Sequence, residues 1–357
     1  MTSEITATAS QPVDAASSSR PYAPSWVNLL TSWIEALPGP AWVAYGVAMT
    51  GGVLLSAWSA IAVAAELSLA VGGALYYGAL PFAVIALIHS LDRTASSALG
   101  VLRPVLAMDD AEISETHHQM TVAPARPAMI VTLIAAIVGP VTYALDPIGS
   151  QIVGYGPVTL FFRWAWESLI TAVFLILIYH SFRQLRLISR IHERVGRIDV
   201  FDQAPLYAMS RVTSSTAVGL LLLLVPSLFL FPAEAGVSYL VITAGWYGFA
   251  VIVCGAAFAL PMRGMHDRLV AEKRRLQGEI GRRITSTLEA VQVAVDAGDV
   301  AAIEARNRAL ATLVASRDVV NRVPTWPWST GALTGFASAI VLPIVLFLVQ
   351  RVLSQLV

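Results

Sequence analysis

Two histidines end apolar segments of this chain in the same local context. His89 is followed by Ser90, and His180 is followed by Ser181 in a later segment. Two imidazoles that face each other could ligate a haem iron axially. Histidines at the ends of membrane helices also bond to headgroups or to backbone groups, and this simpler interpretation is favoured for His89 and His180. We therefore expect no bound cofactor.

A second set of titratable residues combines carboxylates with imidazoles. Its members are Asp109, Asp110, Glu112, Glu115, His117 and His118. Carboxylates beside imidazoles can bind a divalent cation. This spacing does not match a calcium-binding EF-hand loop, which needs ligands at alternate positions and a central glycine. We interpret the segment as a solvated acidic loop and expect no metal site.

No catalytic motif accompanies these residues. The chain has no Gly-x-Ser-x-Gly, His-Glu-x-x-His or P-loop pattern, so readings as a hydrolase or an ATPase lack a motif. The single cysteine, Cys254, excludes an intrachain disulfide and a zinc site built on cysteines. The sequence therefore predicts no catalytic residue, and a non-enzymatic protein is favoured.

Five arginines form a stripe at helical spacing after one of the apolar segments. They are Arg183, Arg186, Arg190, Arg194 and Arg197, with apolar residues on the opposite side of the same predicted helix, 182–198. A basic amphipathic helix of this kind is typical of contact with an anionic inner leaflet, at about 1 kcal/mol per arginine. We expect these arginines to bind anionic lipid.

One further charged pair lies inside an apolar segment. Arg163 and Glu167 are four residues apart, so they can pair along one face of a helix. Trp164 and Trp166 flank them, as in an aromatic belt at the membrane boundary. An interfacial ion pair is the favoured interpretation, and a pair that gates a substrate is the alternative.

Seven long apolar segments must position all of these residues. They lie at roughly 41–64, 68–90, 127–146, 158–180, 212–231, 237–261 and 330–350. Each is long enough to cross about 30 Å of hydrocarbon as a helix. Hydrophobic residues make up 56% of the chain and charged residues only 13%. The predicted fold class is therefore an all-α integral membrane protein with seven transmembrane helices.

The basic residues predict the orientation. If the N-terminus is cytoplasmic, the inner segments 1–40, 91–126, 181–211 and 262–325 hold 21 of the 23 lysines and arginines. The outer turns hold none. This distribution follows the positive-inside rule and places the N-terminus inside and the C-terminus outside. We expect a multi-pass protein of a prokaryotic cytoplasmic (inner) membrane. The net charge is zero, which gives no reason to expect nucleic acid as a partner.

Three segments lie outside the predicted spans. Residues 1–24 are rich in serine, threonine and alanine and are predicted to form a disordered tail. Residues 25–37 are predicted to form an amphipathic helix on the inner surface, with Ser25 as N-cap. Residues 262–322 are predicted to form a cytoplasmic antiparallel helical hairpin, in which Gly298 ends one arm and Asp299 caps the next. The six-helix membrane region would cover 41–261, and 330–357 would hold the seventh span.

The C-terminal part of the chain carries a resemblance. The run from Pro261 through His266 to Leu269, the predicted hairpin, and the segment Pro324-Thr-Trp-Pro-Trp328 before a last span are similar to a set of prokaryotic multi-pass membrane proteins of unassigned function. The resemblance covers about the last 150 residues. It implies an architecture and no activity, cofactor or catalytic residue. The two tryptophans of this segment are expected in the inner aromatic belt.

Three functions follow from these patterns. The favoured one is a non-enzymatic transducer or scaffold whose 262–322 hairpin meets a protein partner or a second copy. The second is a channel or secondary transporter built from repeated helix pairs. The His-Ser dipeptides at 89 and 180 would fit an internal duplication, and a coincidence of spacing is the favoured alternative. The third is a membrane redox protein or enzyme.

Overall fold

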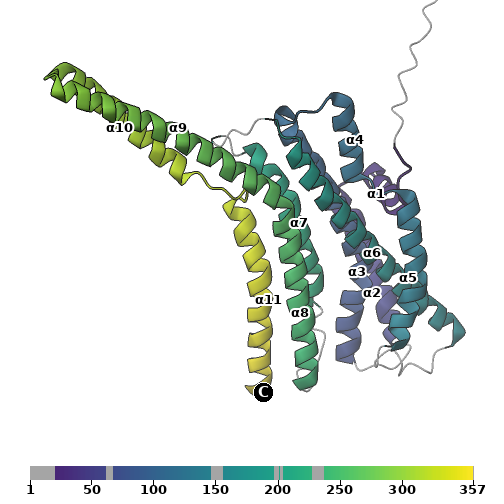
Figure 1. Ribbon diagram of the computed structural model, residues 1–357. Helices are drawn as coiled ribbons and strands as arrows, with labels where there is room; N and C mark the ends of the chain where they lie inside the picture. Colours follow the sequence, from purple (N-terminus) through teal and green to yellow (C-terminus); the bar gives the residue numbers. More distant parts are fainter. Residues whose placement is uncertain are drawn as a thin grey trace, which may run out of the picture.

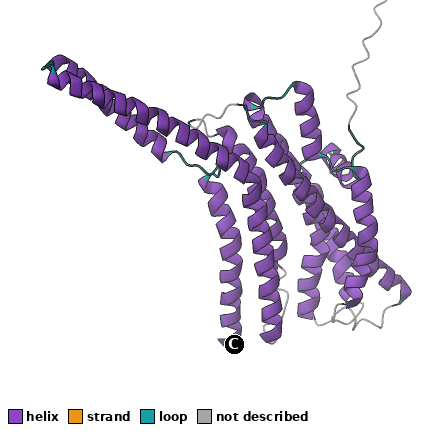
Figure 2. Cartoon of the chain, viewed as in Figure 1, coloured by secondary structure: helices purple, strands orange, loops and turns teal. Residues whose placement is uncertain are grey.

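The computed structural model describes residues 21–61, 67–145, 156–196, 201, 204–226 and 237–356. Within these residues every regular element is a helix, as Figure 2 shows. The all-helical fold class is therefore confirmed. The described ranges leave out the first 20 residues and Arg197. They also leave out the predicted outer turns at 65–67, 147–157 and 232–236, except for Leu67, Gly156 and Pro157.

The helices follow one another with short connections. They are α1 (Trp26–Ala36), α2 (Ala41–Ile61), α3 (Leu67–Leu102), α4 (Asp110–Thr121), α5 (Ala125–Leu145), α6 (Pro157–Glu193), α7 (Ala204–Leu224), α8 (Val237–Ala259), α9 (Arg263–Asp296), α10 (Val300–Arg322) and α11 (Thr330–Leu356). Short 3₁₀ turns lie at Arg103–Val105 and Leu260–Met262.

Six stretches of the described chain are helical, long and apolar enough to cross a membrane. They lie in α2, α3, α6, α7, the combined α8 and α9, and α11. This arrangement is compatible with a multi-pass membrane protein. The helix α5 corresponds to the remaining predicted span, and its described apolar part, Ala125–Val141, is shorter.

The two longest helices of the membrane region, α3 and α6, lie in contact with each other at its centre (Figure 1). α2 packs along α3, and α5 packs along α6. On the other side of α3 lies α7, which contacts α8 and α11. The chain therefore builds two helix pairs that meet at α3 and α6, followed by a group formed by α7, α8 and α11.

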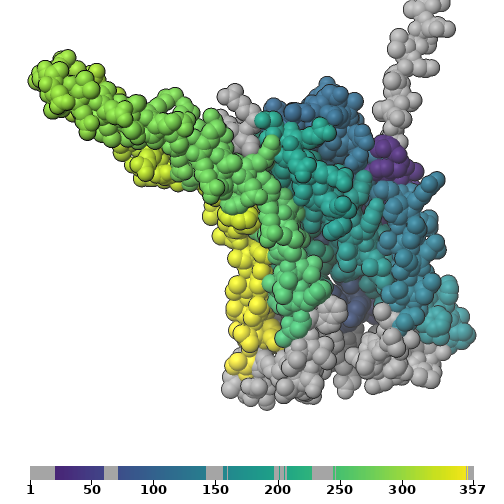
Figure 3. Space-filling view, in the orientation of Figure 1, coloured from purple at the N-terminus to yellow at the C-terminus, as the bar shows by residue number. Residues whose placement is uncertain are grey.

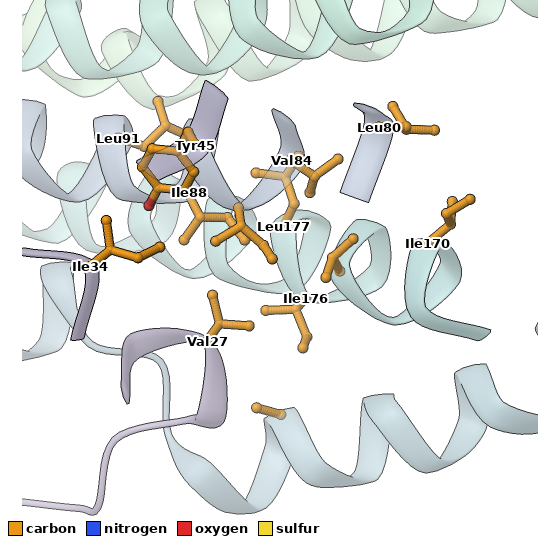
Figure 4. Packing of buried hydrophobic residues seen from close by; sticks show 13 residues of the cluster. Val27, Ile34, Tyr45, Leu80, Val84, Ile88, Leu91, Ile170, Ile176 and Leu177 are labelled. Carbon is orange, nitrogen blue, oxygen red and sulfur yellow. The ribbon is translucent and has the colours of Figure 1, made fainter. Parts of the chain in front are cut away.

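The main apolar core lies between α1, α3 and α6. Val27 and Ile34 of α1 are buried against the cluster that contains Ile88 of α3 and Ile176 of α6 (Figure 4). The indole of Trp26 donates a hydrogen bond to Thr132 of α5 at 2.9 Å. α1 is therefore packed into the helix bundle by one face, rather than resting only on a surface. Its predicted N-cap is confirmed, because the Ser25 side chain accepts from the Asn28 amide.

Glycines allow close approach within both helix pairs. A Cβ at Gly52 of α2 would lie 2.2 Å from the carbonyl oxygen of Gly78 in α3. A Cβ at Gly139 of α5 would lie 2.9 Å from backbone atoms of Glu167 and Ser168 in α6. The backbones of each pair thus touch where a side chain would not fit, which is typical of packed membrane helices.

α9 and α10 lie side by side and extend away from the other helices (Figures 1 and 3). Gly298 has a positive φ of 68° in the turn between them, and the Asp299 side chain accepts from the Ala302 amide. Lys273, the only lysine of the chain, donates to the carbonyls of Asn321 and Val323 at the end of α10. We call α9 and α10 together the rod, and it is about 50 Å long at 1.5 Å per residue of α9.

Candidate functional site

A buried polar cluster joins the two central helices. Nε2 of His180 in α6 lies 2.6 Å from Oδ1 of Asp92 in α3, and Nε2 of Gln184 lies 3.0 Å from the same oxygen. Gln184 also donates to the carbonyl of Met120 at 2.8 Å. His180 and Gln184 have no solvent exposure and Asp92 is 8% exposed. We call Asp92, His180 and Gln184 the polar cluster.

The local geometry assigns the protons of this cluster. His180 and Gln184 are four residues apart in α6, so both point from one helix face toward α3. The two amide hydrogens of Gln184 are taken by Asp92 and Met120, so its 3.1 Å contact with His180 is not a hydrogen bond. The hydrogen on Nε2 of His180 is therefore donated to the Asp92 carboxylate. The pair can hold one proton away from bulk water.

A second polar group lies one helix turn away, where α1, α2 and α3 meet. Tyr45 Oη lies 2.9 Å from Nδ1 of His89, and Nε2 of His89 lies 2.8 Å from Oε1 of Glu35. An ionised carboxylate only accepts, so Nε2 of His89 donates to Glu35 and Nδ1 accepts from the Tyr45 hydroxyl. Arg93 approaches the same Glu35 oxygen at 3.7 Å. The half-exposed Glu35 connects this chain of hydrogen bonds to the surface.

The two histidines singled out by the sequence therefore have different partners. His89 is bound by Tyr45 and Glu35, and His180 is bound by Asp92. In the described ranges no group of three or more histidine, cysteine, aspartate or glutamate residues is close enough to hold a metal ion. What the arrangement can do chemically is hold or transfer a proton along donor and acceptor pairs.

The ends of α3 and α6 are bonded to each other beyond these groups. Ala107 donates its amide hydrogen to the Arg194 carbonyl at 3.0 Å, and Gly196 donates to the Val105 carbonyl at 3.1 Å. These paired backbone bonds fix the two helix ends side by side. A displacement of α6 at the polar cluster is therefore shared with the end of α3.

The end of α6 is also bonded to the base of the rod. Arg268 of α9 donates to the carbonyls of His192 and Val195 at 2.6 and 2.8 Å. Nδ1 of His192 lies 3.2 Å from the Pro261 carbonyl, to which it donates. The last carbonyls of a helix lack partners within it, so Arg268 satisfies groups that α6 leaves open. We call these contacts the α6–α9 junction.

A stack of five rings joins the rod to the last helix. His266 of α9 stacks on Trp326 with ring centroids 4.0 Å apart, and Trp326 stacks on Trp328 at 4.5 Å. Phe258 of α8 continues the stack between Trp328 and Phe336 of α11, at 4.7 Å on each side. The two tryptophans thus pack against protein rings, where the sequence predicts a position in an aromatic belt.

The arginine stripe divides between two environments. Arg183 donates to the Val122 carbonyl at 2.6 Å and to the Tyr22 hydroxyl, and burial raises the pKa of Tyr22. The Arg186, Arg190 and Arg194 side chains are exposed. Arg183 is therefore engaged by protein, and the lipid contact of the other three stays a prediction.

The predicted ion pair within α6 also stays a prediction. Nη1 of Arg163 lies 3.4 Å from Oγ of Ser59 in α2. The Glu167 backbone lies at the close approach to Gly139 described above. Arg163 therefore links α6 to α2, which its spacing from Glu167 does not indicate.

The interpretation of residues 109–118 as an acidic loop is wrong. These residues form the start of α4, where the Asp109 side chain accepts from the Glu112 amide and the Glu112 side chain accepts from the Asp109 amide. This reciprocal arrangement is a capping box, and its Asp-x-x-Glu signal is present in the sequence. His117 bonds to Ser96 of α3 at 2.9 Å.

Sequence reasoning missed most of the polar partners. Asp92 and Gln184 lie just beyond the predicted spans. Glu35 lies on the predicted amphipathic helix and Tyr45 in the first predicted span, and the sequence gives neither a polar partner. A usable signal was available: His89 and Asp92 are three residues apart, and His180 and Gln184 are four apart, each pair on one face of an otherwise apolar helix.

Comparisons with known proteins add no family to this description. The chain matches no protein-family model, no curated protein and no solved structure.

Proposed function

We propose that the protein is a non-enzymatic transducer of a membrane, in which the central helices α3 and α6 set the position of the rod. The observation that carries this proposal is the α6–α9 junction, where Arg268 at the base of the rod bonds to the end of α6. The same α6 carries His180 and Gln184 of the polar cluster. A change at the cluster thus has a short, hydrogen-bonded route to the rod.

The continuity of α8 and α9 supports this function. α8 ends at Ala259, a single 3₁₀ turn follows, and α9 begins at Arg263. The rod is therefore a direct extension of a membrane-length helix. A helix transmits tilt along its axis because its backbone bonds are internal. A protein partner or a second copy meeting the rod would receive that movement.

Seven spans are part of this proposal, and the contacts of α5 support them. Val122, just before α5, accepts from Arg183, while Gly139 of α5 meets Ser168. α5 therefore runs antiparallel to α6 over about 25 Å, at 1.5 Å per residue. α3 and α6 point the same way, because Asp92 meets His180 and Leu106 pairs with Val195. The chain must cross back between them, and α5 is placed to do so.

The orientation follows from charge. The positive-inside distribution supports an orientation with the N-terminus and the rod on the cytoplasmic side, which we propose for a prokaryotic inner membrane. In that orientation the exposed Arg186, Arg190 and Arg194 lie near the inner leaflet, where they would bind anionic lipid. The 262–322 segment would then be the cytoplasmic hairpin.

Pulsed electron paramagnetic resonance on the full chain tests the transducer. Spin labels at Ser32→Cys in α1 and Ser286→Cys in the rod, in a Cys254→Ala background, report the distance between bundle and rod. Both serines are exposed. We expect Asp92→Asn to shift this distance distribution. In an Arg268→Gln background the shift should disappear, because the α6–α9 junction that carries it has been cut.

Arg274→Gln is the matched control, since Arg274 lies on the exposed face of the same helix. It should leave both the distribution and its response to Asp92→Asn unchanged. A distribution that Asp92→Asn does not alter, in a chain that remains folded, would contradict the proposal.

A transporter built from repeated helix pairs is the second candidate. The observation that favours it is the likeness of the two pairs: α3 has 36 residues, α6 has 37, and each packs a partner helix at a glycine. The polar cluster lies where the two pairs meet. Transport predicts that spans α2 and α3 superpose on α5 and α6, and that flux depends on Asp92.

A further inference from the structure

A pocket lies beside α3, on the face away from α6's polar cluster. It has a volume of about 520 Å³ and lies between the first turn of α2, the exposed end of α3, and α7. This volume is within the range of small-molecule and cofactor sites. Its α3 residues recur every three or four positions from Ala86 to Val101, so they form one helix face about 22 Å long.

The polar half of the pocket is rich in hydrogen-bond donors. Two guanidinium groups, Arg93 of α3 and Arg211 of α7, line it together with hydroxyls that include Ser90 and Ser97. No aspartate or glutamate is among the lining residues. Arg93 has only the 3.7 Å approach to Glu35, and Arg211 has no ion pair with any residue that the structure describes. The pocket lining therefore carries two positive charges and no negative one, and Glu35 beside Arg93 is the acidic group nearby.

The helix that closes the pocket adds to this field. α2 begins at Ala41, and Ala41 and Trp42 of its first turn line the pocket. The first amide hydrogens of a helix have no acceptor within it, and the helix dipole is positive at that end. Together with the two arginines, this end of α2 favours an anionic group of phosphate size.

The other half of the pocket is apolar and lies at the membrane boundary. Trp42 is 74% exposed, and Ala86 contributes further apolar surface on the hydrocarbon side of His89. The apolar stretch of α3 begins at Val71, and about 20 helical residues cross the hydrocarbon, which brings the boundary near His89. An occupant of the pocket would therefore meet apolar surface on the hydrocarbon side and positive charge on the water side.

We propose that this pocket binds the phosphate head of an anionic membrane amphiphile. Arg93 and Arg211 contact the phosphate oxygens, the hydroxyls of Ser90 and Ser97 complete the donor set, and the acyl part leaves along Trp42. The site is separate from the arginine stripe of α6, and it does not depend on the proposed transducer function. Free phosphate shares the head-group chemistry and lacks the apolar part.

Native mass spectrometry of the full chain in neutral detergent tests this site. The probes are dioleoyl phosphatidylglycerol, dioleoyl phosphatidylcholine and inorganic phosphate, each titrated separately. We expect phosphatidylglycerol to bind in preference to phosphatidylcholine. The double variant Arg93→Gln with Arg211→Gln should weaken it by about tenfold or more, since two charge-assisted contacts are lost. Inorganic phosphate that binds with the same dependence on both arginines, while the lipid does not, would assign the site to a free anion and overturn the amphiphile.

Two further variants keep the result interpretable. Arg282→Gln with Arg317→Gln removes the same charge from exposed positions of the rod and should leave lipid binding unchanged. Ser97→Trp keeps both arginines and fills the pocket from an exposed position of α3, so it should also expel the lipid. Equal binding of the two lipids, or full retention of phosphatidylglycerol by both pocket variants, would refute the proposal.

Discussion

Nε2 of His180 and Oδ1 of Asp92 lie 2.6 Å apart in a place with almost no solvent exposure, and they belong to the two helices around which the bundle is built. A buried carboxylate is costly unless its lone pairs are used. Here Gln184 supplies the second hydrogen bond and ties the pair to Met120. The polar cluster therefore fixes the position of α6 along the axis of α3.

Removing the Asp92 carboxyl group should lower the free energy of unfolding more than removing only its charge. Asp92→Ala leaves the buried donors of His180 and Gln184 without their partner, and each orphaned donor costs about 1–3 kcal/mol of unfolding free energy. Asp92→Asn retains an oxygen at the same place and should cost less. Thermal unfolding of both variants in detergent checks the order.

Glu289→Ala, an exposed carboxylate on the rod, serves as the control and should leave the transition unchanged. If Asp92→Ala unfolds at the same temperature as the native chain, the cluster does not hold the central helices together.

The contact of α2 with α3 should be intolerant of a single methyl group. In Gly52→Ala the new Cβ would meet the Gly78 carbonyl at 2.2 Å, and because that atom belongs to the backbone the helices must separate. Overpacking of this kind costs about 1–3 kcal/mol. Gly51→Ala, one position away with nothing within 4 Å of its Cβ, should be neutral. Equal unfolding temperatures for the two variants would show that α2 is loosely attached.

The five-ring stack should give a spectroscopic signature of the rod's attachment. Trp326 and Trp328 stack at 4.5 Å, close enough for their transitions to couple in near-ultraviolet circular dichroism. Trp326→Ala should remove the coupled signal and raise the rate of proteolysis in the segment after α10. Trp33→Ala, which removes a 60% exposed ring from α1, should preserve the coupled signal. Retention of that signal in Trp326→Ala would exclude the stack.

Local signals in the sequence predicted local structure well. The caps at Ser25 and Asp299 and the left-handed turn at Gly298 depend on neighbouring residues only, and all three are present. The apolar segments predicted helices because lipid leaves the backbone no other partner. The capping box of Asp109 with Glu112 is a local signal of the same kind, and it predicts a helix where the acidic composition suggests a loop.

Contacts between distant segments could not be predicted in the same way. The sequence marks His180 as a polar residue in an apolar helix, but its partner Asp92 is 88 residues away and is chosen by the packing of α3 on α6. The tryptophans of the Pro324–Trp328 segment fit both an aromatic belt and a protein stack by composition. The stack depends on the position of His266 and Phe258 beside them, which packing decides, and the belt position stays a prediction.

We propose that seven helices cross the membrane, with the rod on the same side as the N-terminus. The number of spans depends on whether α5 crosses the membrane. The side on which Gly156, at the start of α6, lies tests this directly. In a Cys254→Ala background, Gly156→Cys should react with a membrane-impermeant maleimide on intact cells, and Ser286→Cys in the rod should react only after permeabilisation. Protection of Gly156→Cys in intact cells, or labelling of Ser286→Cys from outside, would contradict the seven-span account.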